Sequence, residues 1–180
     1  MSSRILSLLV ILFVTLAVGC SDTDDADSTD SPGENDGTSA ADGSGETSTA
    51  DYPEGPYGTT EGSTIANLTF TTGDGGTLSL AEIRSRSGAS VLFLNTAAGW
   101  CSACIEEQPK IENLFGRLGS DGLHVLVAYF EDDQFNPAEP SDAINWANRF
   151  DLSFDVVADV DFVTADYYDE TQTPMNMIVD

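Results

Sequence analysis

Residues 91–109 read Val-Leu-Phe-Leu-Asn-Thr-Ala-Ala-Gly-Trp-Cys-Ser-Ala-Cys-Ile-Glu-Glu-Gln-Pro, and this stretch decides the fold. Its beginning, 91–96, is a short apolar run that is typical of a strand buried on both faces. After Gly99 the apolar residues recur at helical spacing until glycines end the segment beyond Leu118. The pattern therefore predicts a central strand that passes almost directly into a helix.

Cys101 and Cys104 lie at this junction, so Cys101 is expected at the helix N-terminus and Cys104 one turn later. Unpaired backbone N–H groups and the helix dipole stabilise a thiolate there, and thiolate is the form that attacks a disulfide. The three-residue offset places the second sulfur on nearly the same helical face. We therefore predict that Cys101 is the nucleophile and Cys104 the resolving thiol.

The remaining body, from Ile65 onward, alternates strand and helix signals. The expected elements are a β-hairpin of 67–71 and 77–80, a helix over 80–86, a strand over 123–129, a helix capped by Ser141, and short strands over 154–158 and 175–179. Phe93, Phe115, Trp146 and Phe150 are expected in the core. This order predicts an α/β domain with helices layered on a central mixed sheet.

Trp100 to Pro109 resembles the active-site stretch of the thioredoxin superfamily, in its TlpA-like, AhpC/TSA-like branch of extracytoplasmic thiol–disulfide oxidoreductases. That branch typically reads W-C-x-x-C-x-x-E-x-P. Trp100 matches the aromatic residue before the nucleophile, Glu107 the acidic residue, and Pro109 the helix-kinking proline. The resemblance implies a thioredoxin-like fold and supporting roles for these three residues.

Asn95 falls where thioredoxins have a buried Asp and where TlpA-like proteins often have Asn. The resemblance thus leaves open which group deprotonates Cys104, and Glu107 is the hypothesis. Thr173-Pro174 resembles the cis-proline of the family, which faces the cysteines and lets the preceding backbone pair with an extended substrate. The resemblance covers about 64–180, and the last strand and helix of the family are expected to be missing.

The N-terminus reads as a lipoprotein signal. Residues 5–18 form an apolar run of 14 residues, which suits a signal peptide and is short for a membrane span of roughly 20 residues. The run ends in Leu16-Ala17-Val18-Gly19-Cys20, which resembles the bacterial lipobox. We therefore expect a signal peptide over 1–19 and a lipid on Cys20, so that the protein is anchored to a membrane.

The segment that follows is acidic and almost free of aliphatic residues. Residues 21–62 contain a dozen Asp and Glu and no Lys or Arg. Such a composition cannot recover the entropy cost of folding, so 20–62 is expected to be a disordered linker that carries the lipidated cysteine. The thioredoxin-like domain is then expected over 63–180.

The formal net charge of -25 excludes nucleic acid as a partner, because phosphate binding needs clustered Lys and Arg. The expected partners are protein thiols or disulfides as substrates, and a membrane through the anchor on Cys20. The expected location is the bacterial cell envelope, facing the periplasm or the cell exterior.

Other residue patterns argue against metal binding and phosphate binding. A zinc site needs two more ligands, and His124 alone remains; it is expected in the core or at an edge. The glycines of 73–76 lack the Lys-Ser/Thr end of a phosphate loop and turn a hairpin instead. We expect neither a metal site nor a bound cofactor. The acidic run Glu131–Asp133 is expected to be a solvated loop.

Two alternatives stay open. The first is a thiol peroxidase on the same fold, although Ala97 and Ala98 do not supply the Thr and Pro that usually precede a peroxidatic cysteine. The second is a non-enzymatic surface binding module in which the cysteines form a structural disulfide. Copper handling is disfavoured because related copper-assembly proteins usually carry C-x-x-x-C.

Overall fold

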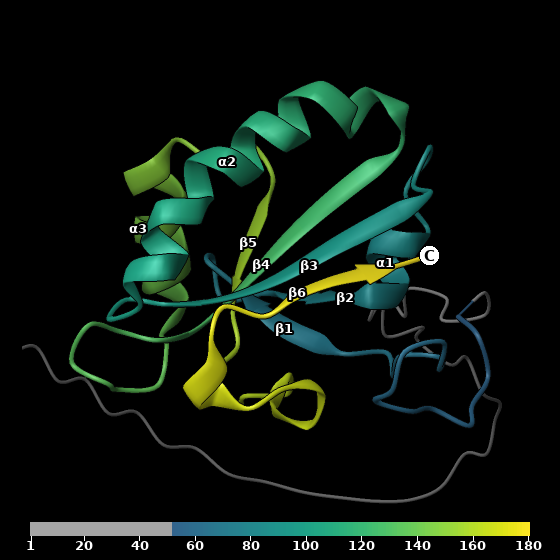
Figure 1. The fold of residues 1–180 in the computed structure, drawn as a ribbon, viewed down its shortest axis with the longest axis horizontal. Coiled ribbons are helices and arrows are strands. Elements are labelled where there is room, and N and C mark those ends of the chain that lie inside the picture. The colour runs from purple at the N-terminus through teal and green to yellow at the C-terminus, as the bar shows by residue number, and fades with distance from the viewer. Residues whose placement is uncertain (1–51) are drawn as a thin grey trace, which may run out of the picture. The chain divides into compact units, whose positions relative to one another are not determined.

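The computed structural model describes residues 52–180, which form an α/β domain (Figure 1). The predicted signal peptide of 1–19, the lipidated Cys20 and the linker up to residue 51 lie outside the described residues. None of the helices in the described part has the length and hydropathy to cross a membrane.

The helices and strands follow the predicted order. The strands are β1 (Thr69–Thr72), β2 (Thr77–Ser79), β3 (Val91–Ala98), β4 (Leu123–Glu131), β5 (Asp155–Ala158) and β6 (Asn176–Val179). The α-helices are α1 (Leu80–Arg84), α2 (Ser102–Leu118) and α3 (Pro140–Phe150). Three short 3₁₀ turns, which no sequence pattern predicted, are η2 (Gly119–Asp121), η3 (Ala165–Tyr167) and η4 (Glu170–Gln172).

All six strands join one mixed sheet in the order β2-β1-β5-β4-β3-β6. The central strands β3, β4 and β5 run parallel, and β6 pairs antiparallel with β3 from Leu92 to Asn95. The predicted N-terminal hairpin, β1 and β2, continues the sheet by pairing antiparallel with β5. β3 therefore lies between β4 and β6, and its C-terminal end leads into α2.

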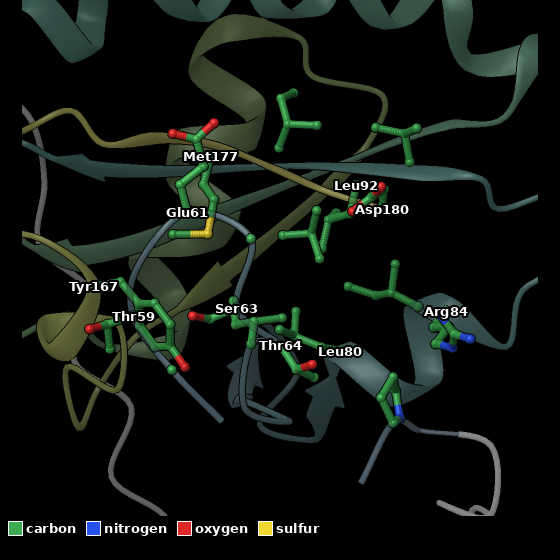
Figure 2. Close-up of a pocket in the computed structure, with 18 of the residues that line it drawn as sticks. Thr59, Glu61, Ser63, Thr64, Leu80, Arg84, Leu92, Tyr167, Met177 and Asp180 are labelled. Atoms are coloured by element: carbon green, nitrogen blue, oxygen red, sulfur yellow. The ribbon is translucent and has the colours of Figure 1, made fainter. Parts of the chain in front are cut away.

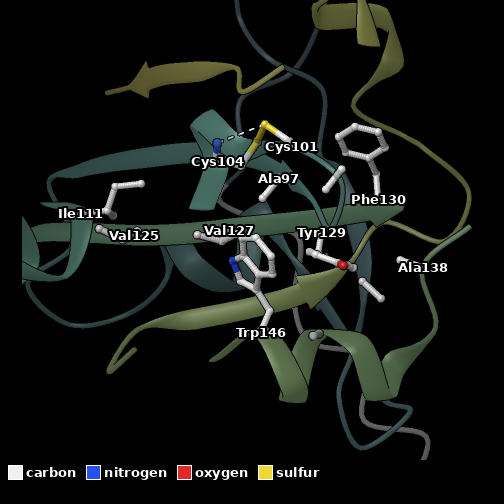
Figure 3. Close-up of a cluster of buried hydrophobic side chains, with 13 residues drawn as sticks. Ala97, Cys101, Cys104, Ile111, Val125, Val127, Tyr129, Phe130, Ala138 and Trp146 are labelled. Carbon is white, nitrogen blue, oxygen red and sulfur yellow. Dashed lines mark hydrogen bonds between the residues drawn. A yellow bond between two sulfur atoms is a disulfide. The ribbon is translucent and has the colours of Figure 1, made fainter. Parts of the chain in front are cut away.

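The sheet buries a hydrophobic core on each face. Along β4, Val125 and Val127 pack with residues of α2 and α3 in one cluster, which Figure 3 shows. Leu126 and Ala128 belong to a second cluster that includes residues of α1. Strand side chains alternate between faces, so a strand with helices on both sides is apolar throughout.

Two helix starts show how local residues set the boundaries. The side chain of Ser79 accepts from the Glu82 backbone N–H and the Glu82 carboxylate accepts from the Ser79 N–H, which forms a capping box at α1. The prediction that Ser141 caps α3 is wrong, since the cap is Glu139. Pro140 follows at a position where a helix needs no N–H, and the Asp142 carboxylate accepts from the Glu139 N–H.

Ordered contacts begin before residue 63, the predicted start of the domain. The Tyr52 hydroxyl donates to the carbonyls of Ile65 and Ala66, at 3.2 Å each. Tyr57 forms a β-bridge with Thr64. Tyr52 also packs against the core cluster that contains Ile65, so the segment from Tyr52 adds to the fold.

Candidate active site

The turn between β3 and α2 is fixed by a close approach at Gly99. The Gly99 N–H donates to the Glu131 carbonyl at 2.8 Å, which holds the turn against the end of β4. A Cβ on Gly99 would lie 2.5 Å from the Tyr129 hydroxyl and 2.6 Å from the Asp133 nitrogen. Only glycine fits there, and Trp100 and Cys101 follow directly.

Cys101 and Cys104 form a disulfide with their Cα atoms 5.2 Å apart. Cys101 is the N-cap of α2, and its sulfur accepts from the Cys104 N–H at 3.0 Å (Figure 3). Cys101 is 5% exposed and Cys104 is completely buried. The first sulfur is thus the one that a partner reaches, and the second lies behind it.

Thr173 and Pro174 lie against the disulfide, and the peptide bond between them is cis, as the sequence predicts. The Thr173 carbonyl oxygen is 3.8 Å from the Cys101 sulfur. Its hydroxyl oxygen is 3.9 Å from the Cys104 sulfur. One residue far along the chain therefore contacts both cysteines.

Thr96 on β3 holds this segment in place. Its N–H donates to the Met175 carbonyl at 3.0 Å, and its hydroxyl accepts from the Met175 N–H at 2.9 Å. Thr96 is completely buried, so both bonds lie away from water. These bonds place the proline loop above the end of β3.

Asn95 organises a polar cluster beneath the cysteines. Its side-chain N–H₂ donates to Glu107 at 2.6 Å and to the Asn176 side chain at 2.9 Å. The Asn176 amide donates to the other Glu107 oxygen at 3.2 Å, which closes a ring of three side chains. Both oxygens of Glu107 are therefore occupied by amide donors, and the ring connects β3, α2 and β6.

Gln108 completes the cluster. It is completely buried, and its amide N–H₂ donates to the Asn95 side chain at 3.2 Å and to the Cys104 carbonyl at 3.3 Å. Sequence reasoning missed it, although a polar residue four positions after Cys104, on the buried face of a helix, is a usable signal. Asn176 had no such signal because its role depends on the register of β6.

Trp100, which is half-buried, forms an aromatic surface with the exposed Phe135 beside the disulfide. Its ring stacks on Phe135, with centroids 5.4 Å apart, and its indole N–H donates to Glu131 at 2.8 Å. Phe135 is 65% exposed and has a left-handed φ of 65°. The Asp132 carboxylate accepts from Asn136 and from nearby backbone N–H groups, which lowers its pKa and fixes this loop.

The structure thus brings together almost all of the residues that the sequence selects: Asn95, Trp100, Cys101, Cys104, Glu107, Thr173 and Pro174. Pro109 is the exception, because it lies in the interior of α2 with an exposed side chain. Among the described residues, no cluster of three or more His, Cys, Asp or Glu has the arrangement of a metal site.

A cavity of about 710 Å³ lies apart from the cysteines (Figure 2). Residues 58–65 and strand β6 contribute to its lining. Its lining includes Glu61, Arg84, His124 and Met177. Cys101, Cys104 and Thr173 do not line it. The candidate chemistry therefore belongs to the junction of β3 and α2, and this cavity is separate from it.

A mixed sheet with a Cys-x-x-Cys pair at a strand–helix junction, opposite a cis-proline, defines a thioredoxin-like protein. The comparison with family models agrees: residues 62–180 match the model described as the AhpC/TSA family. The chain belongs to that family.

A curated relative matches part of the chain in sequence. The thiol-disulfide oxidoreductase ResA of Halalkalibacterium halodurans is 27% identical over 99 residues, which are 54% of this chain and 52% of the relative. The chain therefore matches about half the length of that curated relative.

Two solved structures carry the fold at low identity. A secreted thiol-disulfide isomerase from Corynebacterium glutamicum has a TM-score of 0.53 at 18% identity, over 65% of this chain and 70% of that one. A candidate thiol:disulfide interchange protein DsbE from Chlorobium tepidum has a TM-score of 0.52 at 19% identity, over 64% and 74%. These likenesses establish the thioredoxin-like fold.

Gly99→Ala is expected to destabilise the domain by about 1–3 kcal/mol, because the added methyl would collide with Tyr129 and the backbone at Asp133. Urea unfolding measures the loss. The matched control is Gly116→Ala, on the exposed face of α2, where an added Cβ meets nothing within 4 Å. That control should be neutral or stabilising by up to about 1 kcal/mol. Equal effects of the two substitutions would contradict the close approach.

Proposed function

We propose that the domain is a thiol–disulfide oxidoreductase that exchanges electrons with protein thiols or disulfides through Cys101 and Cys104. The observation that carries the proposal is the position of Cys101, whose sulfur caps α2 and accepts the Cys104 N–H at 3.0 Å. An N–H aimed at a sulfur, at the positive end of a 17-residue helix, favours thiolate over thiol. The family of the chain and its similarity to ResA support the same activity.

In the reduced protein, the Cys101 thiolate attacks one sulfur of a substrate disulfide. A mixed disulfide forms between Cys101 and the substrate, and the other substrate sulfur leaves as a thiolate. Cys104 loses its proton and attacks the Cys101 sulfur, which releases the second substrate thiol and leaves the Cys101–Cys104 disulfide. The 5.2 Å between the two Cα atoms matches the closed product.

Substrate docking is proposed at the backbone of Thr173, next to Pro174. An extended segment placed beside Thr173 would bring its cysteine to the Cys101 sulfur, which lies 3.8 Å from the Thr173 carbonyl. Trp100 and Phe135 extend this surface with two stacked, accessible rings. Such a surface suits contact with protein chains of varied sequence.

The location outside the cytoplasm and the lipid anchor belong to the same proposal. They are supported by the apolar run of 5–18 and by the Leu-Ala-Val-Gly-Cys motif that ends at Cys20. Two or three acyl chains would hold the protein on a membrane, because each buried CH₂ contributes about 0.8 kcal/mol.

Expression in a bacterial host with radiolabelled palmitate is expected to label the protein and place it in the membrane fraction. Cys20→Ser should abolish both the label and the membrane association. The control is Cys101→Ser, which leaves the motif at Cys20 intact and should label normally. An unlabelled parent protein would refute the lipid anchor and would leave the redox proposal unaffected.

The redox pair is expected to have a reduction potential between about -120 and -270 mV, the span of known exchange catalysts. The measurement equilibrates the Cys20→Ser protein, in which only Cys101 and Cys104 can pair, in glutathione or dithiothreitol buffers and traps the free thiols. A potential well below about -300 mV would indicate a structural disulfide and favour the binding-module alternative.

The division of labour between the two cysteines predicts different mutant behaviour. Cys104→Ser should accumulate a stable mixed disulfide with a substrate protein, because no thiol within the variant can then attack the Cys101 sulfur and release the substrate. Cys101→Ser should accumulate none, since Cys104 is completely buried. Non-reducing electrophoresis followed by mass spectrometry measures both. Trapping by Cys101→Ser in place of Cys104→Ser would reverse the assigned roles.

A further inference from the structure

The completely buried Cys104 raises the question of where its proton goes when it resolves a mixed disulfide. The polar side chain in contact with its sulfur is Thr173, whose hydroxyl oxygen is 3.9 Å away. Glu107, the candidate from the sequence, has one oxygen bonded to Asn95 and the other to Asn176. The Thr173 hydroxyl is therefore the candidate for the first acceptor of the Cys104 proton.

Tyr168 is a neighbour of Thr173. Its hydroxyl oxygen is buried and completes no well-formed hydrogen bond, although the hydroxyls of Thr96, Thr164 and Thr173 are its polar neighbours. Its ring packs against Phe130 and Phe162, which keeps the hydroxyl away from water. Burial raises the pKa of Tyr168 to about 12, so the phenol stays protonated. A buried hydroxyl without a settled partner is uncommon in a folded protein and calls for an explanation.

Asp159 is at the far end of these hydroxyls. It follows β5, is 2% exposed, and accepts from the Thr164 hydroxyl at 2.6 Å and from the Val163 N–H at 2.7 Å. Burial raises the pKa of the Asp159 carboxyl above its usual range, and the neighbouring Asp161 adds to that shift. A buried carboxylate that favours protonation is suited to receive a proton.

Resting on the proposed function, we propose that the Cys104 proton travels through the hydroxyls of Thr173, Tyr168 and Thr164 to the Asp159 carboxylate. Each hydroxyl accepts one proton and gives up its own, and the contacts of Tyr168 with Thr173 and Thr164, which are not well-formed hydrogen bonds in the disulfide form, close as the proton passes. The observed Thr164-to-Asp159 bond already has this direction. Thr173 contacts the reacting sulfur, and the other three residues act through it.

The step balances without another reagent. The Cys104 thiol and the Asp159 carboxylate, with a mixed disulfide on Cys101, give the Cys101–Cys104 disulfide, a substrate thiolate and a protonated Asp159. The Cys104 sulfur supplies the electron pair of the new S–S bond, and the leaving substrate sulfur takes the pair of the old one. Asp159 returns its proton along the relay when the pair is reduced again.

The relay predicts a specific pH dependence. Asp159 must be ionised to accept the proton, and its pKa is raised, so assistance is lost as the pH falls through that raised value. Charged or titratable groups near the relay are Asp161 beside Asp159, Tyr168 within it, and Glu107 on the helix of Cys104. At high pH, hydroxide removes the Cys104 proton directly and the relay is no longer needed.

The test is a single-turnover reaction of the reduced full chain, carrying Cys20→Ser, with dithiodipyridine. This uncharged aromatic disulfide releases one thiopyridone when Cys101 attacks and a second when Cys104 resolves. Stopped-flow absorbance from about pH 5 to pH 9 thus gives both rates in one trace. The second phase reports the proton transfer from Cys104, and the first serves as an internal reference.

Tyr168→Phe removes only the hydroxyl and should slow the second phase about tenfold or more at neutral pH. The first phase should stay within about twofold, and the two proteins should converge at high pH. The matched control is Tyr167→Phe, because that adjacent hydroxyl accepts from the Ala66 N–H. Thr164→Val should reproduce the Tyr168→Phe defect, and Asp159→Asn should also remove the acid limb of the second phase.

The outcomes separate the relay from the proposed function. If the first thiopyridone is not released, Cys101 is unreactive and the oxidoreductase proposal itself fails. If the first phase is normal and Tyr168→Phe and Thr164→Val leave the second phase unchanged at every pH, the relay is refuted. A second phase that responds to Glu107→Gln and not to Tyr168→Phe would instead assign the proton to Glu107. A similar loss in Tyr167→Phe would indicate a structural effect.

Discussion

The two hydrogen bonds between Thr96 and Met175 join parts of the chain that are 79 residues apart, and the site depends on them. Thr96 lies on β3 shortly before Cys101, and Met175 directly follows Pro174. Because β6 pairs with β3 in a fixed antiparallel register, Thr173 lands beside both sulfurs. A slip of one residue would turn every β6 side chain to the other face and separate Thr173 from the cysteines.

Next to the cysteines, polar side chains occupy buried positions that apolar residues usually fill. Asn95 and Gln108 are completely buried, and together they bond to the side chains of Glu107 and Asn176 and to the Cys104 carbonyl. A buried polar network stabilises a single arrangement when its members are satisfied and is costly when they are not. Gln108 Oε1 has no hydrogen-bond partner among the described residues, so the cluster is not fully satisfied; its other bonds join α2 to β3 and β6 around Cys104.

The sequence predicts what is local. The buried strand that passes into a cysteine-bearing helix, the hairpin and the cis bond before Pro174 all follow from neighbouring residues or from a motif. The cap of α3 was misplaced because Pro140 and Asp142 outweigh the intrinsic preference for Ser141. Asn176 and Tyr168 were missed because their surroundings come from distant strands and turns, and no short-range pattern encodes that register.

Burial of Cys104 has two consequences that pull in opposite directions. It keeps the resolving thiol away from other reactants, and at neutral pH it also slows the loss of that thiol's proton to water. Two carboxyl groups, Glu107 and Asp159, differ in their burial and in their hydrogen-bond donors. Glu107 is partly exposed, and amide donors on both of its oxygens hold it in place. Asp159 is buried, with a raised pKa and a hydroxyl aimed at it from Thr164. In the proposed relay, Glu107 therefore keeps the geometry of the site through its two amide donors, and the buried Asp159, to which the Thr164 hydroxyl already donates, receives the proton.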